Sequence, residues 1–599
     1  MVNELSIQNL KSFTLLGLEL SAGLEAWFTP LWLIGIGAML GLVLISLLWL
    51  SSQLLSKVDR INMLLERPKK ALLVAAVIAV VLSAIILPFR LGSVSMPSSG
   101  IENDTILSHL MKMIGLYLTC LFVAYSFLVL AWRRTARELP LILREGMLMP
   151  LFLIVCTLAA VGLIGTVVAP DTSGIVGSLF KLPNSGVTSY QFELSPGDTP
   201  VRETVDIHVG DVGGMEIETT GAIQASFTPF DQLPENFKLD DITSDSIYRV
   251  SPYEPGILET IPPGEDGDLT AKSVISKIYL SNVGPDPATV GVFVRYVPQY
   301  SQVVCIPVTA LGIVVIFLVY IVQRMASPRM FAVALSTFKS EVAQPLFALV
   351  VSGGVCALIA FVWIPYNTFG EDIKMLKDTG LTLILVLSIV LALWSASTSV
   401  AEEIEGRTAL TVLSKPLNRR SFVIGKYVGI VWTLLLVYLV FSIVFMAAVA
   451  YKPIYDAKEA SMGTPEWQTC YLEMIRLAPG LVLAFMEALV FTALSVAIST
   501  RLPLLANMTI CLVIYALGHL TPLVVESSME GAGFGIIRFF AQLIATVFPN
   551  LELFNIQAAI SAGVDVPFVY LGWAFSYCAI YSLIAMLLAL IMFEDRDLA

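Results

Sequence analysis

Residues 427–450 decide the fold class: they form the run YVGIVWTLLLVYLVFSIVFMAAVA, which contains no charged side chain. A bilayer core about 30 Å thick needs about 20 consecutive apolar residues per helix, so this run is long enough to cross a membrane. Ten further runs have a similar length and lie at about 30–50, 71–89, 113–132, 147–169, 303–323, 345–364, 380–399, 479–499, 504–525 and 567–592. The sequence therefore predicts an all-α polytopic membrane protein with about 11 transmembrane helices.

The composition agrees with a membrane protein. Of the 599 residues, 57% are apolar and only 14% are charged, whereas soluble proteins are about 45–50% apolar. The mean hydropathy is +0.82. These values exclude a soluble globular enzyme, a disordered protein, a collagen-like fibre and a small disulfide scaffold. The net charge of −12 gives no reason to expect a nucleic-acid partner.

Residues 170–302 differ from the rest of the chain. They hold 11 Asp and 8 Glu against 7 Lys and Arg, and apolar residues alternate with polar ones, as at Tyr190, Phe192 and Leu194. This period of two is typical of short antiparallel strands. We therefore predict an inserted β-sandwich-like domain here, between a region of four spans at 1–169 and a fifth span within 303–324.

The positions of Lys and Arg predict the orientation of the chain. With the N-terminus outside and the C-terminus inside, the cytoplasmic loops hold 19 basic residues, and the outside loops other than 170–302 hold 8. Cytoplasmic loops are normally the basic ones. We therefore expect a multi-pass protein of the cytoplasmic (inner) cell membrane with residues 170–302 on its extracytoplasmic side. We expect no removable signal peptide, because no basic region precedes a short apolar core at the N-terminus.

Two further segments are predicted to lie at or partly within the membrane. A helix is predicted to begin at Ser327-Pro328, with a serine cap and a proline in the first turn. Its apolar stripe is Phe331, Leu335, Phe338 and Val342, with Lys339 and Glu341 off the stripe. This pattern indicates a helix in the cytoplasmic interface. Residues 534–548 are apolar but short, so we predict a re-entrant segment within 531–560.

The most informative stretch is cytoplasmic and runs from an acidic to a basic end. Three acidic residues follow directly on a predicted span, and Glu403 is spaced i, i+4 from Arg407, a favourable helical pair. Pro416 stops this helix, and Asn418 is placed to cap the next one. The basic residues at the inner membrane edge are Arg419, Arg420 and Lys426. A short charged helix between two spans would move both spans when a force acts on it.

The same stretch resembles a known family. Residues 403–408 read Glu-x-Glu-Gly-x-Thr, 413–419 read Leu-Ser-x-Pro-Leu-Asn-Arg, and 425–427 read Gly-Lys-Tyr. This order is similar to that of ABC-2 type ABC transporter permeases, in particular the branch named for multi-copper-enzyme maturation and gliding motility. The resemblance covers about 325–599, and no second copy of the pattern occurs in the first half.

The resemblance implies a permease domain at 325–599 with six spans, an interfacial helix before them and a re-entrant segment before the last. It also implies a coupling helix at 400–415, which docks into a separate ABC ATPase subunit, and a permease dimer. ATP and Mg²⁺ would then be bound by that partner. The residues that the resemblance assigns to ATPase coupling are Glu402, Glu403, Glu405, Gly406, Arg407, Thr408, Pro416, Arg419, Arg420, Gly425 and Lys426.

The motifs of catalysis and of nucleotide or metal binding are missing from the sequence. There is no Gly-x-x-x-x-Gly-Lys-Ser/Thr loop for ATP phosphates, no HExxH motif and no Gly-x-Ser-x-Gly elbow. The three histidines, His109, His208 and His519, are far apart in the sequence. We therefore expect no cofactor, no metal site and no catalysis by this chain alone.

Glu487 is the only carboxylate deep within a predicted span, so it is either part of a translocation path or a hydrogen-bonding link between helices. His519 carries the same two interpretations. Two alternatives to an ATP-driven permease follow from the sequence. One is a secondary transporter driven by protons through Glu487. The other is a mechanotransmission or assembly device that holds an extracytoplasmic protein partner through 170–302.

Overall fold

The fold is described from a computed structural model of the chain. The description covers residues 22–58, 63, 68–91, 106–144, 146–196, 201–208, 212–226, 247–250, 256–258, 274–283, 286–364, 366, 371–405, 418–530, 539, 543 and 548–594. The chain divides into two compact units. The first comprises Met1–Met63, Val129–Pro170 and Val308–Ala599, and the second comprises Leu64–Leu128 and Asp171–Pro307.

Nine helices within the described residues are long and apolar enough to cross a membrane. They are Ala22–Leu55, Met113–Leu130, Leu148–Val168, Ser301–Ala326, Pro345–Trp363, Asp372–Ala401, Arg419–Glu459, Trp467–Ser499 and Phe568–Glu594. The predicted runs at 71–89 and 504–525 coincide with two shorter apolar stretches, Lys70–Ile86 and Leu504–Leu520. The chain is a helical, multi-pass membrane protein, as the sequence predicts.

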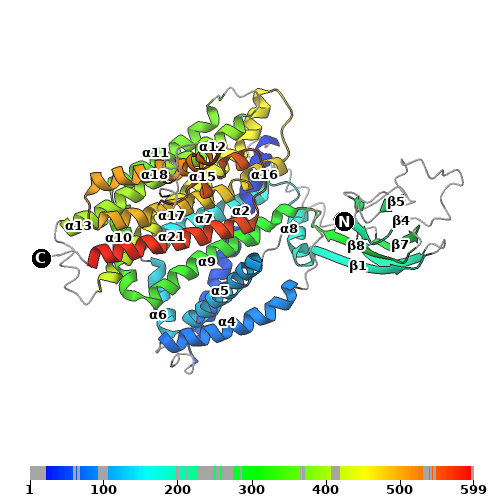
Figure 1. Ribbon diagram of the computed structural model, residues 1–599, viewed down its shortest axis with the longest axis horizontal. Helices are drawn as coiled ribbons and strands as arrows, with labels where there is room; N and C mark the ends of the chain where they lie inside the picture. Colours follow the sequence, from blue (N-terminus) through cyan, green and yellow to red (C-terminus); the bar gives the residue numbers. More distant parts are fainter. Residues whose placement is uncertain are drawn as a thin grey trace. The chain divides into compact units, whose positions relative to one another are not determined.

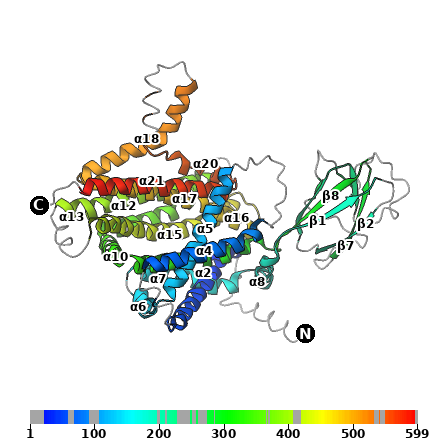
Figure 2. The same cartoon turned by 60° about the horizontal axis from the view of Figure 1, so that its bottom comes forward.

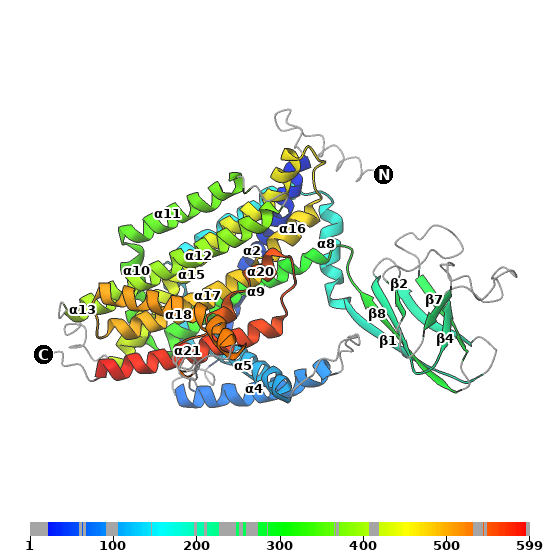
Figure 3. The same ribbon diagram turned by 45° about the horizontal axis from the view of Figure 1, so that its top comes forward.

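The first unit consists of helices (Figure 1). Its helices are α2 (Ala22–Leu55), α6 (Arg133–Arg144), α7 (Leu148–Val168), α9 (Cys305–Ala326, from Val308), α10 (Pro328–Val342), α11 (Pro345–Ala360), α12 (Asp372–Ala396), α13 (Glu402–Glu405), α15 (Arg419–Glu459), α16 (Trp467–Ile475), α17 (Ala478–Ser499), α18 (Leu504–Glu530), α20 (Gln557–Ser561) and α21 (Phe568–Glu594). A π-helical segment, Ser397–Ala401, continues α12. Helices α11, α12 and α15 lie side by side in Figure 3 and contact one another.

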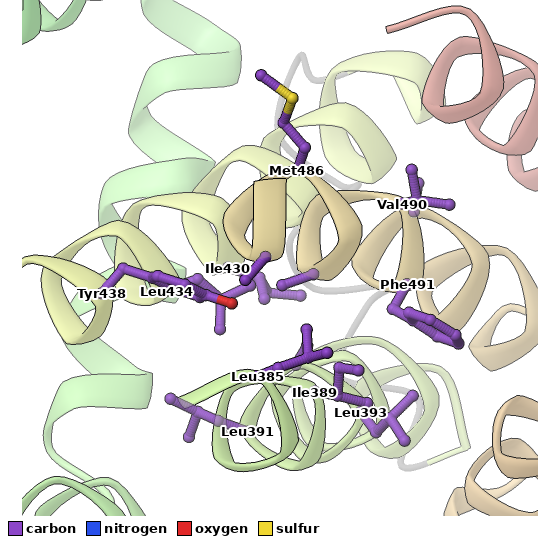
Figure 4. Packing of buried hydrophobic residues seen from close by; sticks show 14 of the residues in the cluster. Leu385, Ile389, Leu391, Leu393, Ile430, Leu434, Tyr438, Met486, Val490 and Phe491 are labelled. Atoms are coloured by element: carbon purple, nitrogen blue, oxygen red, sulfur yellow. The ribbon is translucent and has the colours of Figure 1, made fainter. Parts of the chain in front are cut away.

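Helices α12, α15 and α17 form the buried centre of the first unit. In the most apolar stretch of each of these three spans, more than half of the residues are buried. In each of the other spans, a third or fewer are buried. Figure 4 shows how Leu385 and Ile389 of α12, Leu434 of α15, and Val490 and Phe491 of α17 pack together.

Helices α2 and α7 pack through glycines. A Cβ atom added to Gly35 would lie 2.4 Å from the backbone nitrogen of Gly162, so only glycine permits this approach. Small residues commonly allow helix backbones to meet closely in membranes. Two turns before Gly35, the indole nitrogen of Trp27 donates a hydrogen bond to the Ala447 carbonyl of α15 over 2.9 Å. The first span is therefore hydrogen-bonded to α15, a central helix within residues 325–599.

The predicted re-entrant segment, 531–560, lies only partly within the described residues. From 548 onward it forms a 3₁₀ turn at Glu552–Phe554 and the short helix α20. The Leu551 amide donates to the Gly518 carbonyl of α18 over 3.3 Å, and the Leu551 side chain is fully buried. Helix α20 contacts α12. Residues 548–561 therefore lie against the helices of the centre, where they help to enclose the cavity described below.

The second unit contains α4 (Pro68–Leu91), α5 (Ile106–Leu130, up to Leu128), α8 (Thr172–Lys181) and eight strands. The strands are β1 (Gly186–Leu194), β2 (Val201–His208), β3 (Val212–Thr219), β4 (Ile223–Ser226), β5 (Ile247–Val250), β6 (Gly256–Leu258), β7 (Val274–Asn282) and β8 (Ala288–Tyr296). They form two four-stranded antiparallel sheets in the orders β1-β8-β3-β6 and β2-β7-β4-β5. Figure 2 shows β1 beside β8.

The two sheets share one apolar core. Ile217 and Val292 contribute to it from the first sheet, and Ile223 and Leu280 from the second. The alternation along β8, where Val290, Val292 and Val294 are buried, is the period-two pattern expected of a strand with one buried face. The ends of the strand region are also connected, because the Tyr300 hydroxyl donates to the Asp171 carboxylate before α8 over 3.0 Å.

Candidate functional site

The residues assigned to ATPase coupling span 402–426, which we call the coupling segment, and the structure describes its two ends, 402–405 and 418–426. Glu402, Glu403 and Glu405 lie on α13, which follows directly on the π-helical segment at the end of α12. A π-helix widens the turn by one residue, and such turns are frequent at functional sites. Gly406, Arg407, Thr408 and Pro416 lie outside the described residues. Arg419, Arg420, Gly425 and Lys426 lie on the first turns of α15.

An ion pair joins the two ends of the segment. The Lys426 Nζ atom lies 2.6 Å from Glu403 Oε1, and the lysine side chain is 5% exposed against 34% for the glutamate. Lys426 Nζ also lies 5.5 Å from the centre of the Phe422 ring, a cation–π contact. The partner of Glu403 in this pair is a lysine 23 positions further along the chain; the Glu403–Arg407 pair predicted from helical spacing involves a residue outside the described chain.

A second carboxylate, which the sequence analysis did not select, belongs to the same site. Glu341 of α10 is only 2% exposed, and the Thr398 hydroxyl of the π-helical segment donates to its Oε1 atom over 3.5 Å. Glu341 lies off the predicted apolar stripe, but Val333, Thr337 and Glu341 are all buried at intervals of four residues. This second buried stripe mixes an apolar residue with two polar ones, so hydrophobicity alone gives no signal for it in the sequence. We call Glu341, Thr398, Glu403 and Lys426 the polar junction.

The polar junction gives Glu341 an unusual ionisation. Burial raises the pKa of its carboxyl to about 7, the nearby Glu403 carboxylate raises it further, and Thr398 and Lys426 oppose the shift. An unfolded chain would release this proton near pH 4.5. Between these values the folded protein binds more protons than the unfolded chain, so the free energy of unfolding falls as pH rises.

We therefore expect the contribution of Glu341 to stability to be complete below about pH 4.5 and to be lost as pH rises through about 7. The slope contributed by Glu341 is at most about 1.4 kcal/mol per pH unit. Thermal unfolding of the detergent-solubilised chain at several pH values measures it, and Glu341→Gln should flatten the profile between pH 5 and 7. An unchanged profile in this variant would assign the pH dependence to other groups.

Gly425 has a packing role that explains its place in the pattern. A Cβ atom at Gly425 would lie 2.7 Å from Val333 Cβ and 2.9 Å from the Met330 carbonyl oxygen of α10. One turn later, a Cβ at Gly429 would lie 2.7 Å from the Ala334 carbonyl oxygen. Helix α10 therefore lies directly on the start of α15, and this close approach brings Glu341 and Lys426 into one site.

Gly425→Ala should lower the free energy of unfolding by about 1 kcal/mol or slightly more, because the methyl group must push α10 away. Gly353→Ala is the matched control, since no atom lies within 4 Å of the position that its Cβ would take. It should be neutral or slightly stabilising, because alanine favours helix. Thermal midpoints in the same detergent measure both. Equal midpoints for the two variants would refute the close packing of α10 on α15.

The remaining basic residues of the predicted set have different surroundings. Arg419 donates from Nη1 to the Glu594 carbonyl at the end of α21 over 2.7 Å, and it lies over the Phe593 ring. It thus satisfies a terminal carbonyl of the last span. Arg420 is exposed. Asn418 and Ser327 occupy the N-cap positions predicted for them, but neither side chain makes a capping hydrogen bond.

Buried hydrogen bonds continue from the junction into the centre of the unit. Asn507 of α18 is fully buried and donates to Ser397 in the π-helical segment over 2.8 Å and to Ser495 of α17 over 2.7 Å. Cys511 donates from its thiol to the Asn507 side-chain oxygen over 3.4 Å. A displacement of the π-helical segment would therefore act directly on α17 and α18.

The two residues predicted for a translocation path, Glu487 of α17 and His519 of α18, come together. Glu487 Oε1 lies 3.7 Å from His519 Nε2, with side-chain exposures of 2% and 22%. Both line a cavity of about 100 Å³. The Tyr515 and His519 rings lie 4.5 Å apart between centres. This pair is separate from the polar junction, and it links two helices across a cavity.

A search against models of known protein families finds no match. A search of curated proteins likewise finds none with significant similarity.

Proposed function

We propose that this chain is the membrane subunit of an ATP-driven transporter of the ABC-2 type. A separate ABC ATPase subunit would dock on residues 400–415, and two copies of the chain would form the permease. The resemblance of residues 403–427 suggests this class, and family analogy alone suggests the dimer. ATP and Mg²⁺ would be bound by the partner.

The observation that supports the proposal best is the Glu403–Lys426 ion pair at the base of the segment. It joins α13 to α15 at 2.6 Å. A force on residues 406–417 would therefore act on α12 and α15 together, because the ion pair links the two helices. Through Glu341 the same force reaches α10, and through Ser397 and Asn507 it reaches α17 and α18. Such discrete polar contacts are suited to transmit a motor's motion.

The two-sheet module of the second unit fits the proposal as an extracytoplasmic β-sandwich-like domain. The charge distribution of the loops favours that side. A domain of this kind would present a surface to a protein partner or to the transported molecule. Protease added from the outside of intact cells should cleave within 170–302, and protection there would reverse the proposed orientation.

The proposal is tested by purifying the tagged chain from its native membrane in mild detergent. We expect a P-loop ATPase to co-purify and the reconstituted complex to hydrolyse ATP. Solute flux that depends on ATP would identify a transporter. Hydrolysis coupled to release of an extracytoplasmic protein, with no flux, would instead identify a mechanotransmission device. If the purified chain transports solute without any ATPase, both the ATP-driven transporter and the mechanotransmission device are ruled out.

The Glu487–His519 pair favours a second candidate, a secondary transporter driven by protons. A buried ionisable pair within a membrane is a common element of proton relays. In that case Glu487→Gln would abolish transport in vesicles that lack ATP, and a proton gradient alone would drive uptake. Under the first proposal, a proton gradient without ATP drives none.

A further inference from the structure

The cavity at Glu487 is a built site with mixed polar and aromatic walls. It lies between α12, α17, α18 and residues 554–557, and its volume is about 100 Å³. A single water needs roughly 10–15 Å³ of such space, so the cavity holds several waters or a small organic group. The polar residues that line it are Thr382, Glu487, Tyr515, His519, Asn555 and Gln557.

One carboxylate oxygen in this cavity has no hydrogen-bond partner among the residues that the structure describes. This atom is Glu487 Oε1, and its side chain is only 2% exposed. A buried carboxylate oxygen that accepts no hydrogen bond is costly. The site therefore favours a ligand that supplies a positive charge and a donor at this oxygen.

The histidine beside it has its proton on the other nitrogen. His519 Nδ1 lies 3.2 Å from the Tyr515 carbonyl oxygen. A carbonyl only accepts, so Nδ1 donates and carries the hydrogen. In the neutral ring Nε2 is then an acceptor, and it faces Glu487 Oε1 at 3.7 Å. When Glu487 is ionised, these two atoms are both acceptors, and a donor between them or beside them would satisfy both.

The opposite wall adds further acceptors and an aromatic surface. The Thr382 hydroxyl donates to Gln557 Oε1 over 3.2 Å. This hydrogen bond holds the Gln557 amide oxygen against α12 at the cavity wall. Asn555 Nδ2 donates to the Glu552 carboxylate over 3.3 Å, which places a second acid next to the lining residues. The Tyr515 ring offers a π face, to which organic cations are attracted.

A metal ion fits this site less well than an organic cation. No group of three His, Cys, Asp or Glu side chains that could hold a metal occurs among the residues that the structure describes. We propose that the cavity binds the ammonium group of a small organic amine, with its N–H groups donating to Glu487 Oε1 and His519 Nε2. This inference does not depend on ATPase coupling.

The test is calorimetric titration of the full chain in lipid nanodiscs with ethylammonium chloride. Tetramethylammonium keeps the charge but lacks N–H donors, and ethanol keeps a donor but lacks the charge. We expect saturable binding of ethylammonium, binding of tetramethylammonium weakened at least tenfold, and no binding of ethanol. Equal binding of the two cations, or no saturable binding of ethylammonium to folded protein, would overturn the proposal.

Variants assign the binding to this cavity. Glu487→Gln should weaken ethylammonium binding at least tenfold, whereas Glu466→Gln, an exposed glutamate before α16, should leave it unchanged. Ala484→Leu keeps every charged group but adds volume at a lining position, and it should also abolish binding. If Glu487→Gln does not fold, Ala484→Leu decides alone. Unchanged binding in Ala484→Leu would place the ligand elsewhere.

Discussion

Lys426→Ala is expected to destabilise the protein more than any other single change in the polar junction. The substitution removes the ammonium group that pairs with Glu403, and it leaves Glu341 and Glu403 as neighbouring acids. Removing one partner of a buried ion pair typically costs about 3–5 kcal/mol. Because Glu403 is about one-third exposed, solvent screening reduces the expected loss to about 2–3 kcal/mol.

The control for this prediction lies on the same helix. Lys458 is exposed near the end of α15, and Lys458→Ala should change stability by less than about 0.5 kcal/mol. The exchange Glu403→Lys with Lys426→Glu should recover part of the loss, because it restores opposite charges. Thermal unfolding in one detergent measures all three. A Lys426→Ala protein as stable as the parent would show that the junction is not a structural link.

The second large effect is expected from charge reversal within the coupling segment. Glu405→Lys should weaken binding of the ATPase subunit at least thirtyfold, or about 2 kcal/mol. The substitution places a positive charge where the proposed docking surface carries a negative one, and a mismatched charge in an interface is strongly unfavourable. Glu403→Lys is a poorer test, since it would set two lysines against each other at 2.6 Å in the parent geometry. Thermal unfolding of the Glu405→Lys protein shows whether a loss of binding is separate from a loss of folding.

This prediction also has a matched control. Glu466 is an exposed glutamate on the side predicted to be extracytoplasmic, so Glu466→Lys adds the same charge without approaching a cytoplasmic partner. Binding is measured by the amount of ATPase retained on the immobilised permease at increasing ATPase concentration. Equal affinities for the two variants would remove residues 402–405 from the docking surface.

The sequence predicts the membrane fold well because hydrophobicity is a local property. A run such as 427–450 specifies a span without reference to the rest of the chain. The acidic α13 and the basic start of α15 were likewise found from charge alone. The Glu403–Lys426 pair was not predicted, because these residues meet only after α12 and α15 have packed, whereas helical spacing reveals only pairs within one helix.

Tertiary packing explains the other differences. Glu341 is buried because glycines at 425 and 429 let α10 lie directly on α15, and a single amphipathic stripe does not reveal a second contact face. Glu487 and His519 were selected separately, as rare polar residues in apolar runs. Their approach to 3.7 Å depends on the packing of α17 against α18, and the cavity beside them is closed in part by residues 554–557. Sequence patterns alone give neither contact.

The most direct measurement of the central claim is photo-crosslinking from the segment itself. A benzophenone amino acid at Thr408, in native membranes, should form a crosslink to a protein that ATP analogues label. The same group at Met462, which is 74% exposed on the side predicted to be extracytoplasmic, should give no such product. If the group at Thr408 crosslinks only to lipid, or only to proteins that do not bind nucleotides, residues 400–415 do not dock an ATPase.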